Sequence, residues 1–112
     1  MTINELIVET LEDVGVPVQF MTYEGTENTY ITFFCFLEQG FIFSDDSELL
    51  TDFNVQIDIW SKGDSLEVED KVRQALKENG FIKTGIYDDY EKDTKIYHKV
   101  LRYKYITENK EE

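Results

Sequence analysis

The chain has 112 residues, enough for one domain with a hydrophobic core, and its 14% aromatic content offers ample apolar surface to offset the entropy of folding. The net charge of −13 argues against binding to a nucleic-acid backbone, because such binding needs a basic patch that releases counterions. The longest apolar stretch, residues 30–37, is too short to cross a bilayer and too aromatic for a signal peptide, so we expect a soluble protein made in the cytoplasm.

The charge is distributed unevenly along the chain. Residues 1–61 hold 12 acidic side chains and no Lys or Arg, which gives −12. Residues 62–112 hold the other 12 acidic side chains and all 11 basic ones, which gives −1. This asymmetry has two interpretations: an acidic surface that keeps the protein soluble, or a polar subunit that associates head to tail, as in a ring.

The first predicted element is a helix over residues 2–14. Thr2 and Glu5 have the spacing of a capping box, and Gly15 follows as a stop signal. The apolar residues that recur at helical spacing are Ile3, Leu6, Ile7, Leu11 and Val14.

Three extended segments are predicted next. The first covers residues 18–23 and ends in a polar turn. The second covers residues 30–43 and has apolar groups on both faces, as in a central strand. An acidic loop at residues 44–48 leads to the third, residues 52–60, where apolar and polar residues alternate. We expect one face of this third strand to be buried and the other to be wet or paired with a partner.

A second helix and two strands complete the pattern. Asp64 and Glu67 give a cap-like start to the helix, and Asn79-Gly80 ends it. Its apolar stripe consists of Leu66, Val72, Ala75 and Leu76. The two strands cover residues 81–90 and 95–107.

The order α-β-β-β-α-β-β predicts an α+β fold: a mostly antiparallel sheet with two helices packed on one face. We expect a single domain over residues 1–107 and a frayed tail over residues 108–112. The second face of the sheet would stay open in one chain, and an open aromatic face is typical of proteins that assemble.

Residue types that carry catalysis are scarce. Cys35, the only cysteine, lies in an aromatic run, which favours a buried hydrophobe over a reactive thiol. His98, the only histidine, lies inside the last predicted strand, which favours a sheet residue over a general base. No glycine falls in a phosphate-binding pattern, and no G-x-S-x-G motif is present. We expect no enzymatic activity and no cofactor.

Two acidic clusters bear on metal binding. Residues 89–93 have the spacing with which a calcium loop begins, but Thr94 stands where Gly is required and Val100 where the bidentate Glu belongs. The acidic loop at residues 44–48 favours a solvated segment over a cation site. The sequence therefore predicts no metal site.

The last predicted strand has two unlike faces. One parity holds Tyr97, Leu101, Tyr103 and Tyr105, and the other holds His98, Arg102 and Lys104. The pattern favours a half-buried strand with a solvated basic face. The alternative is an interface, where Tyr and Arg are enriched.

The most specific motif is V-Q-I-D-I-W-S at residues 55–61, followed by a helix at a fixed distance that ends near Asn79-Gly80. This motif resembles the tail-terminator (tail-completion, or head–tail joining) proteins of long-tailed bacteriophages. The leading helix, the G-V-P-V link at residues 15–18 and the closing hairpin at residues 88–105 fit the same family pattern. The resemblance covers roughly residues 3–107, and the chain is more acidic than many relatives.

The resemblance implies a structural protein that forms a hexameric ring, caps the tail tube and joins the tail to the head connector. Its partners would be copies of itself, the tail tube protein and the head-completion protein. Free in solution, the chain could also be a monomer. DNA would pass through the lumen without specific binding. The implied location is the virion, at the head–tail interface, after assembly in the host cytoplasm. The family has no catalytic residues.

We expect ring subunits to meet through an acidic edge and a basic edge. The residues assigned to this interface are Glu38, Asp45, Asp46, Glu48 and Asp52 on the acidic side, and Lys95, Lys99, Arg102 and Lys104 on the basic side. Exposed ion pairs contribute about 0–1 kcal/mol each, so repetition and buried area would have to supply the rest. Two other functions stay open: a monomeric acidic interaction module, such as an inhibitor or DNA mimic that binds a basic partner, and a small-molecule or metal-binding domain.

Overall fold

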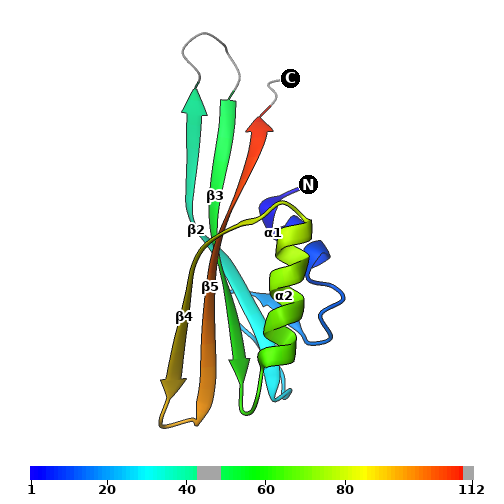
Figure 1. Ribbon diagram of the computed structural model, residues 1–112, viewed down its shortest axis with the longest axis vertical. Coiled ribbons are helices and arrows are strands. Elements are labelled where there is room, and N and C mark those ends of the chain that lie inside the picture. Colours follow the sequence, from blue (N-terminus) through cyan, green and yellow to red (C-terminus); the bar gives the residue numbers. More distant parts are fainter. Residues whose placement is uncertain (43–48, 110–112) are drawn as a thin grey trace.

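The computed structural model describes residues 1–42 and 49–109, which form one five-stranded mixed sheet with two helices on one face (Figure 1). Helix α1 spans Ile3–Thr10 and helix α2 spans Leu66–Glu78. The strands are β1 (Val18–Phe20), β2 (Thr29–Ile42), β3 (Leu49–Ser61), β4 (Ile82–Glu91) and β5 (Ile96–Asn109). The predicted α+β class and the order α-β-β-β-α-β-β are confirmed.

The order of strands in the sheet is β1-β2-β3-β5-β4. β1 runs parallel to β2, and the other neighbours are antiparallel. The first half of the chain thus builds β1, β2 and β3, and the second half builds β5 and β4. The charge asymmetry of the sequence therefore becomes an asymmetry across the sheet, because β1, β2 and β3 contain no Lys or Arg, whereas β4 and β5 contain both acidic and basic residues.

The hydrophobic core lies between the helices and one face of the sheet. The alternation predicted for β3 is confirmed on this side, where Val55, Ile57 and Ile59 are buried. The other sheet residues of the core are Ile31, Phe33, Leu101 and Tyr103, and the helices add Ile7, Val72 and Leu76. The opposite sheet face, called the open face below, carries Gln56, Asp58 and Trp60 of β3.

Helix α1 begins as the sequence predicts and ends earlier. The Glu5 amide donates to Thr2 Oγ1 (3.1 Å) and the Thr2 amide donates to Glu5 Oε1 (3.2 Å), which is the expected capping box. The helix stops at Thr10 because the chain then turns through tighter bonds, in which the Val14 amide donates to the Leu11 carbonyl.

Two predictions for α2 were wrong. Ser65, not Asp64, is the N-cap residue, and Asp64 Oδ1 instead accepts a hydrogen bond from the Leu66 amide (2.9 Å). Leu66 is 64% exposed rather than part of the apolar stripe. Six residues before Val72, it lies roughly 120° around the helix from the buried side.

Strand ends differ from the sequence prediction by a few residues. β1 stops at Phe20, because Met21 has a positive φ of 65°. β5 continues through Asn109, past the expected end at residue 107. The predicted acidic loop at 44–48 and the last three residues of the predicted frayed tail lie outside the described residues.

β2, β3 and β5 extend beyond the helices (Figure 1), and the molecule measures 53 × 23 × 23 Å. We call this extension the distal arm; it consists of residues 37–42, 49–54 and 104–109, which pair in register. The arm begins at a β-bulge in β2, where the register shifts between Cys35 and Leu37.

We predict that Leu76→Ala lowers the free energy of unfolding by about 2–5 kcal/mol, because this fully buried side chain of α2 fills the core. Leu66→Ala, in the same helix, should change stability by less than about 0.5 kcal/mol because Leu66 is exposed. Urea denaturation of both variants measures this difference. Equal losses would contradict the packing described.

Candidate functional site

A connected network of polar and aromatic side chains covers the middle of the open face. His98 Nε2 of β5 lies 2.7 Å from Asp58 Oδ1 of β3, and the two side chains are only 14% and 5% exposed. The Trp60 ring stacks on the His98 ring with centroids 3.7 Å apart. Trp60 Nε1 also donates to Thr32 Oγ1 of β2 (3.0 Å). These contacts tie three strands together through their outward side chains.

The network continues to both sides. Gln56 Nε2 donates to Asp58 Oδ1 (2.8 Å), and Arg102 Nε donates to Gln56 Oε1 (3.1 Å). The Arg102 guanidinium lies over the rings of Phe36 and Tyr87, 4.9 and 5.6 Å from their centroids. A cation held between two rings gains electrostatic attraction from both. The open face is therefore ordered across β2, β3, β5 and β4.

Two buried acidic residues of β3 are paired in the same way. Asp52 Oδ2 lies 3.2 Å from Lys104 Nζ, and Asp52 is only 4% exposed. In the β3–β5 register, Lys104 stands two residues from the position opposite Asp52, and His98 stands two residues from the position opposite Asp58. Both are diagonal cross-strand pairs, which lie within reach of long side chains. The face of β3 that was expected to be solvent-exposed or bound to a partner is thus partly buried by pairing within the chain.

The structure disperses the residues that the sequence assigned to a subunit interface. Asp52 and Lys104 pair with each other within one chain through Asp52 Oδ2. Glu38 is exposed on the other face of the distal arm, and Lys95 is exposed next to β5. Arg102 belongs to the network on the open face. Asp45, Asp46 and Glu48 lie outside the described residues. A role of these residues between subunits stays a prediction.

Lys99 points to the helix side of the sheet, away from the other assigned basic residues of β5. Its Nζ lies 2.6 Å from Asp88 Oδ1 and 3.5 Å from Glu69 Oε1. The hydrogen bond with Asp88 raises the pKa of Lys99 above its usual range, and Glu69 adds to the rise while partial burial opposes it. Lys99 therefore stays a cation at neutral pH and does not act as a neutral amine.

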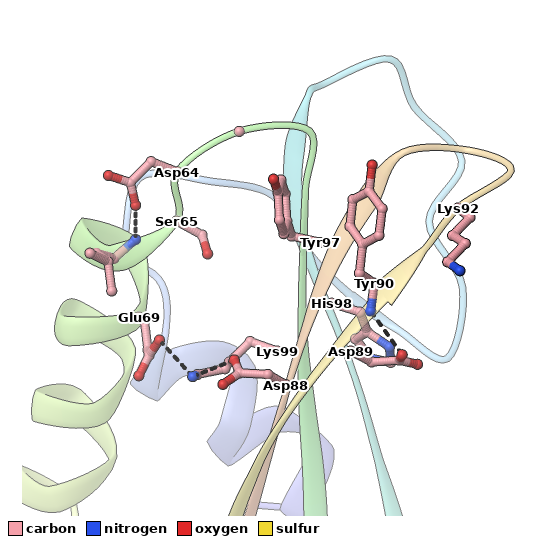
Figure 2. Close-up of a pocket in the computed structure, with 12 residues that line it drawn as sticks. Asp64, Ser65, Glu69, Asp88, Asp89, Tyr90, Lys92, Tyr97, His98 and Lys99 are labelled. Carbon is pink, nitrogen blue, oxygen red and sulfur yellow. Dashed lines mark hydrogen bonds and ion pairs between the residues drawn. The ribbon is translucent and has the colours of Figure 1, made fainter.

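Lys99 forms the floor of an open groove of about 770 Å³ between the start of α2 and the end of the β4–β5 hairpin. Figure 2 shows Lys99 between Glu69 and Asp88, with Tyr90 and Tyr97 standing above it on the hairpin. The two tyrosine rings lie 4.8 Å apart and are about half exposed. At the floor of the groove the positive charge of Lys99 is paired with two carboxylates, and one wall consists of two aromatic rings. This arrangement suits contact with another surface better than catalysis.

The described residues offer little for catalysis. The Asp58–His98 pair resembles part of a catalytic triad, but His98 has no hydroxyl or thiol partner within the part of the chain that the structure describes. Cys35 is half-buried against the core, and its thiol donates to the Leu37 carbonyl (3.6 Å). Among residues 1–42 and 49–109, no three His, Cys, Asp or Glu side chains come together as metal ligands. Neither helix described is long and apolar enough to span a membrane.

Comparison with known proteins gives a likeness in fold alone. No protein-family model and no curated protein matches the sequence. The structure is similar to a chain in the virion of native gene transfer agent (GTA) particle, with a TM-score of 0.60 and 12% sequence identity. The match covers 93% of this chain and 85% of that chain. The whole fold, rather than one motif, is therefore shared with that virion chain.

The network residues of β3 were visible in the sequence but were not assigned to a site; of their partners, only Arg102 was assigned, to the subunit interface. Gln56, Asp58 and Trp60 are the outward-facing residues of the V-Q-I-D-I-W-S motif on β3. Their alternation with buried residues indicated the face on which they lie. Their partners on β5 follow only from the register between two strands that are about 40 residues apart in the chain.

We predict that Asp58→Ala destabilises the protein by about 1–3 kcal/mol, because His98 and Gln56 both lose a buried acceptor. Asp89→Ala is the matched control: Asp89 lies opposite His98 on β4 but is exposed, so its loss should cost less than about 0.5 kcal/mol. Fluorescence of Trp60, the only tryptophan, followed through urea denaturation measures both effects. An Asp58→Ala variant with unchanged stability would mean that the network does not stabilise the sheet.

Proposed function

We propose that this chain is a structural protein of a phage-like tail, which caps the tail tube as a ring and joins the tail to the head connector. The observation that carries the proposal is the likeness of fold, over 93% of the chain, to a chain in the virion of a gene transfer agent particle. The resemblance of the β3 motif to tail-terminator proteins points to the same class of function.

The two sides of the sheet supply the two different surfaces that a head-to-tail ring requires. In such a ring, one surface of each subunit meets a different surface of the next. Strands β1, β2 and β3 contain acidic residues but no Lys or Arg, whereas β4, β5 and the turn between them carry Lys83, Lys92, Lys95, Lys99, Arg102 and Lys104. Exposed cations on this second side include Lys83, Lys92 and Lys95. A neighbour's acidic side would fit them better than a copy of the same side.

The proposed partners are further copies of the chain, the tail tube protein and the head-completion protein. The net charge of −13 per subunit would give the ring a negative field, which repels DNA phosphates and lets DNA pass through the lumen without binding. We also propose that the protein is not an enzyme. The contacts that support this are those of His98, which is bonded to Asp58 and stacked on Trp60, and of Lys99, which is held as a cation.

The net charge favours one alternative, a monomeric acidic module that occupies a basic site on a partner protein. The two functions differ in self-association. A ring held by ion pairs assembles at low salt and weakens as salt screens the charges, whereas an inhibitor or DNA mimic stays monomeric at every salt concentration. Light scattering across protein and salt concentrations separates them.

We predict that the purified chain stops the growth of tubes formed by the tail tube protein of the same genome and leaves ring density at one tube end in electron micrographs. Reversing two exposed cations, in a Lys92→Glu, Lys95→Glu variant, should weaken ring formation about tenfold because the charge complementarity is repeated at every contact. Lys77→Glu, in α2, is the control. Tubes that grow without limit in the presence of the folded wild-type chain would contradict the proposal.

A further inference from the structure

Within residues 1–42 and 49–109, the sheet has an unpaired edge along the outer half of β2. β1 pairs only with Ile31, Thr32 and Phe33, so among the described strands the rest of β2 has a partner, β3, on one side only. An unpaired edge presents a row of backbone N–H and C=O groups that another strand can pair with. The distal arm carries this free edge away from the helices (Figure 1).

The opposite edge of the sheet, β4, has features that discourage pairing. Its register shifts between Lys83 and Gly85, and its second half carries the exposed charges of Asp88, Asp89 and Glu91. Bulges and charges of this kind blunt an edge strand.

The free edge of β2 lacks this protection beyond its bulge. Residues 37–41 pair regularly with β3 and contain one charge, Glu38. Leu37 and Phe41 point to the open face and are 43% and 44% exposed. A regular, apolar and nearly uncharged edge is the kind that recruits a further strand.

We propose that residues 37–41 pair antiparallel with the same segment of a second copy of this chain, about a two-fold axis through Gln39. In this register Leu37 lies opposite Phe41 of the second copy, so the two exposed apolar side chains cover each other on the open face. Glu38 lies opposite Gly40, which brings no like charge and leaves room for the longer side chain.

Neighbouring registers are worse for identifiable reasons. Centring the pair on Glu38 would place two carboxylates directly opposite each other, which is destabilising. A shift by one residue would turn the open faces of the two copies to opposite sides of the joined sheet and separate Leu37 from Phe41. The segment is therefore complementary to itself in one register.

This contact goes beyond the proposed ring and responds to salt in the opposite sense. It uses backbone groups and apolar side chains, while the net charge of −13 on each copy opposes it. Added salt screens that repulsion and strengthens the pair, whereas it weakens a ring held by ion pairs. The contact involves five residues of each copy, so it buries less area than the roughly 800 Å² per partner of a stable interface. We therefore expect it to form at high protein concentration.

Gly40 provides a sharp test because it tolerates a side chain in the single chain. Among the described residues, a Cβ at this position would meet only the Leu50 carbonyl oxygen, at an ordinary distance of 3.8 Å, and the φ of Gly40 lies outside the left-handed region. Gly40→Glu should therefore leave the fold intact. In the dimer, the new carboxylate of each copy would lie opposite Glu38 of the other copy, which creates two like-charged pairs. We expect about tenfold weaker dimerisation by sedimentation velocity.

The double variant Glu38→Lys, Gly40→Glu replaces each like-charged pair with an opposite-charged one and should restore dimerisation to at least the wild-type strength. Glu38→Lys alone should dimerise as the wild type does, because a Lys then faces glycine. Unchanged dimerisation in Gly40→Glu, or no rescue in the double variant, would overturn the register. A wild-type chain that stays monomeric at high salt and high concentration would overturn the contact itself.

A second measurement locates the axis. In a Cys35→Ser background, Gln39→Cys should form disulfide-linked dimers under oxidation by copper phenanthroline, because a residue on the axis faces its own copy within the Cα distance that a disulfide needs. Thr84→Cys, exposed on β4, is the matched control and should link far less. Equal cross-linking at both positions would refute the proposed axis. Association that weakens as salt is added and is unchanged by Gly40→Glu would support the ring and refute this contact.

Discussion

Strand β3 lies at the centre of the sheet, and the rest of the structure depends on its alternation. Val55, Ile57 and Ile59 face the helices and hold the core, while the intervening polar residues face outward. Because side chains alternate with a period of two, a slip of one residue would exchange the two sets and expose the core. The register of β3 with β5 therefore fixes both the packing of the helices and the content of the open face.

The outward residues strengthen the same register. Asp52 and Asp58 each make a diagonal pair with a basic or imidazole group of β5, six residues apart and in the same geometry. Buried acidic groups are costly unless they are paired, so a shifted register would leave two carboxylates without partners. The open face thus disfavours wrong pairings and leaves aromatic and apolar side chains exposed at its margins.

Much of the fold could be predicted from the sequence, because local periodicity determines it. The alternation in β3, the capping box at Thr2 and the glycine after the first helix gave the order of elements. The cross-strand partners could not be predicted, since nothing local relates His98 to Asp58. For the same reason the sequence assigned Asp52 and Lys104 to contacts between subunits, although they meet within one chain. The charge asymmetry was visible in the sequence, but its lateral arrangement required the strand order.

We propose that this chain works by its shape and surfaces, as a ring that ends a tail tube. The most direct measurement is the tail length of particles produced with and without the chain, seen by electron microscopy. We expect tails of one length when the chain is present, and overgrown tubes that lack heads when it is absent. Headed particles with tails of normal length in its absence would contradict the proposed function.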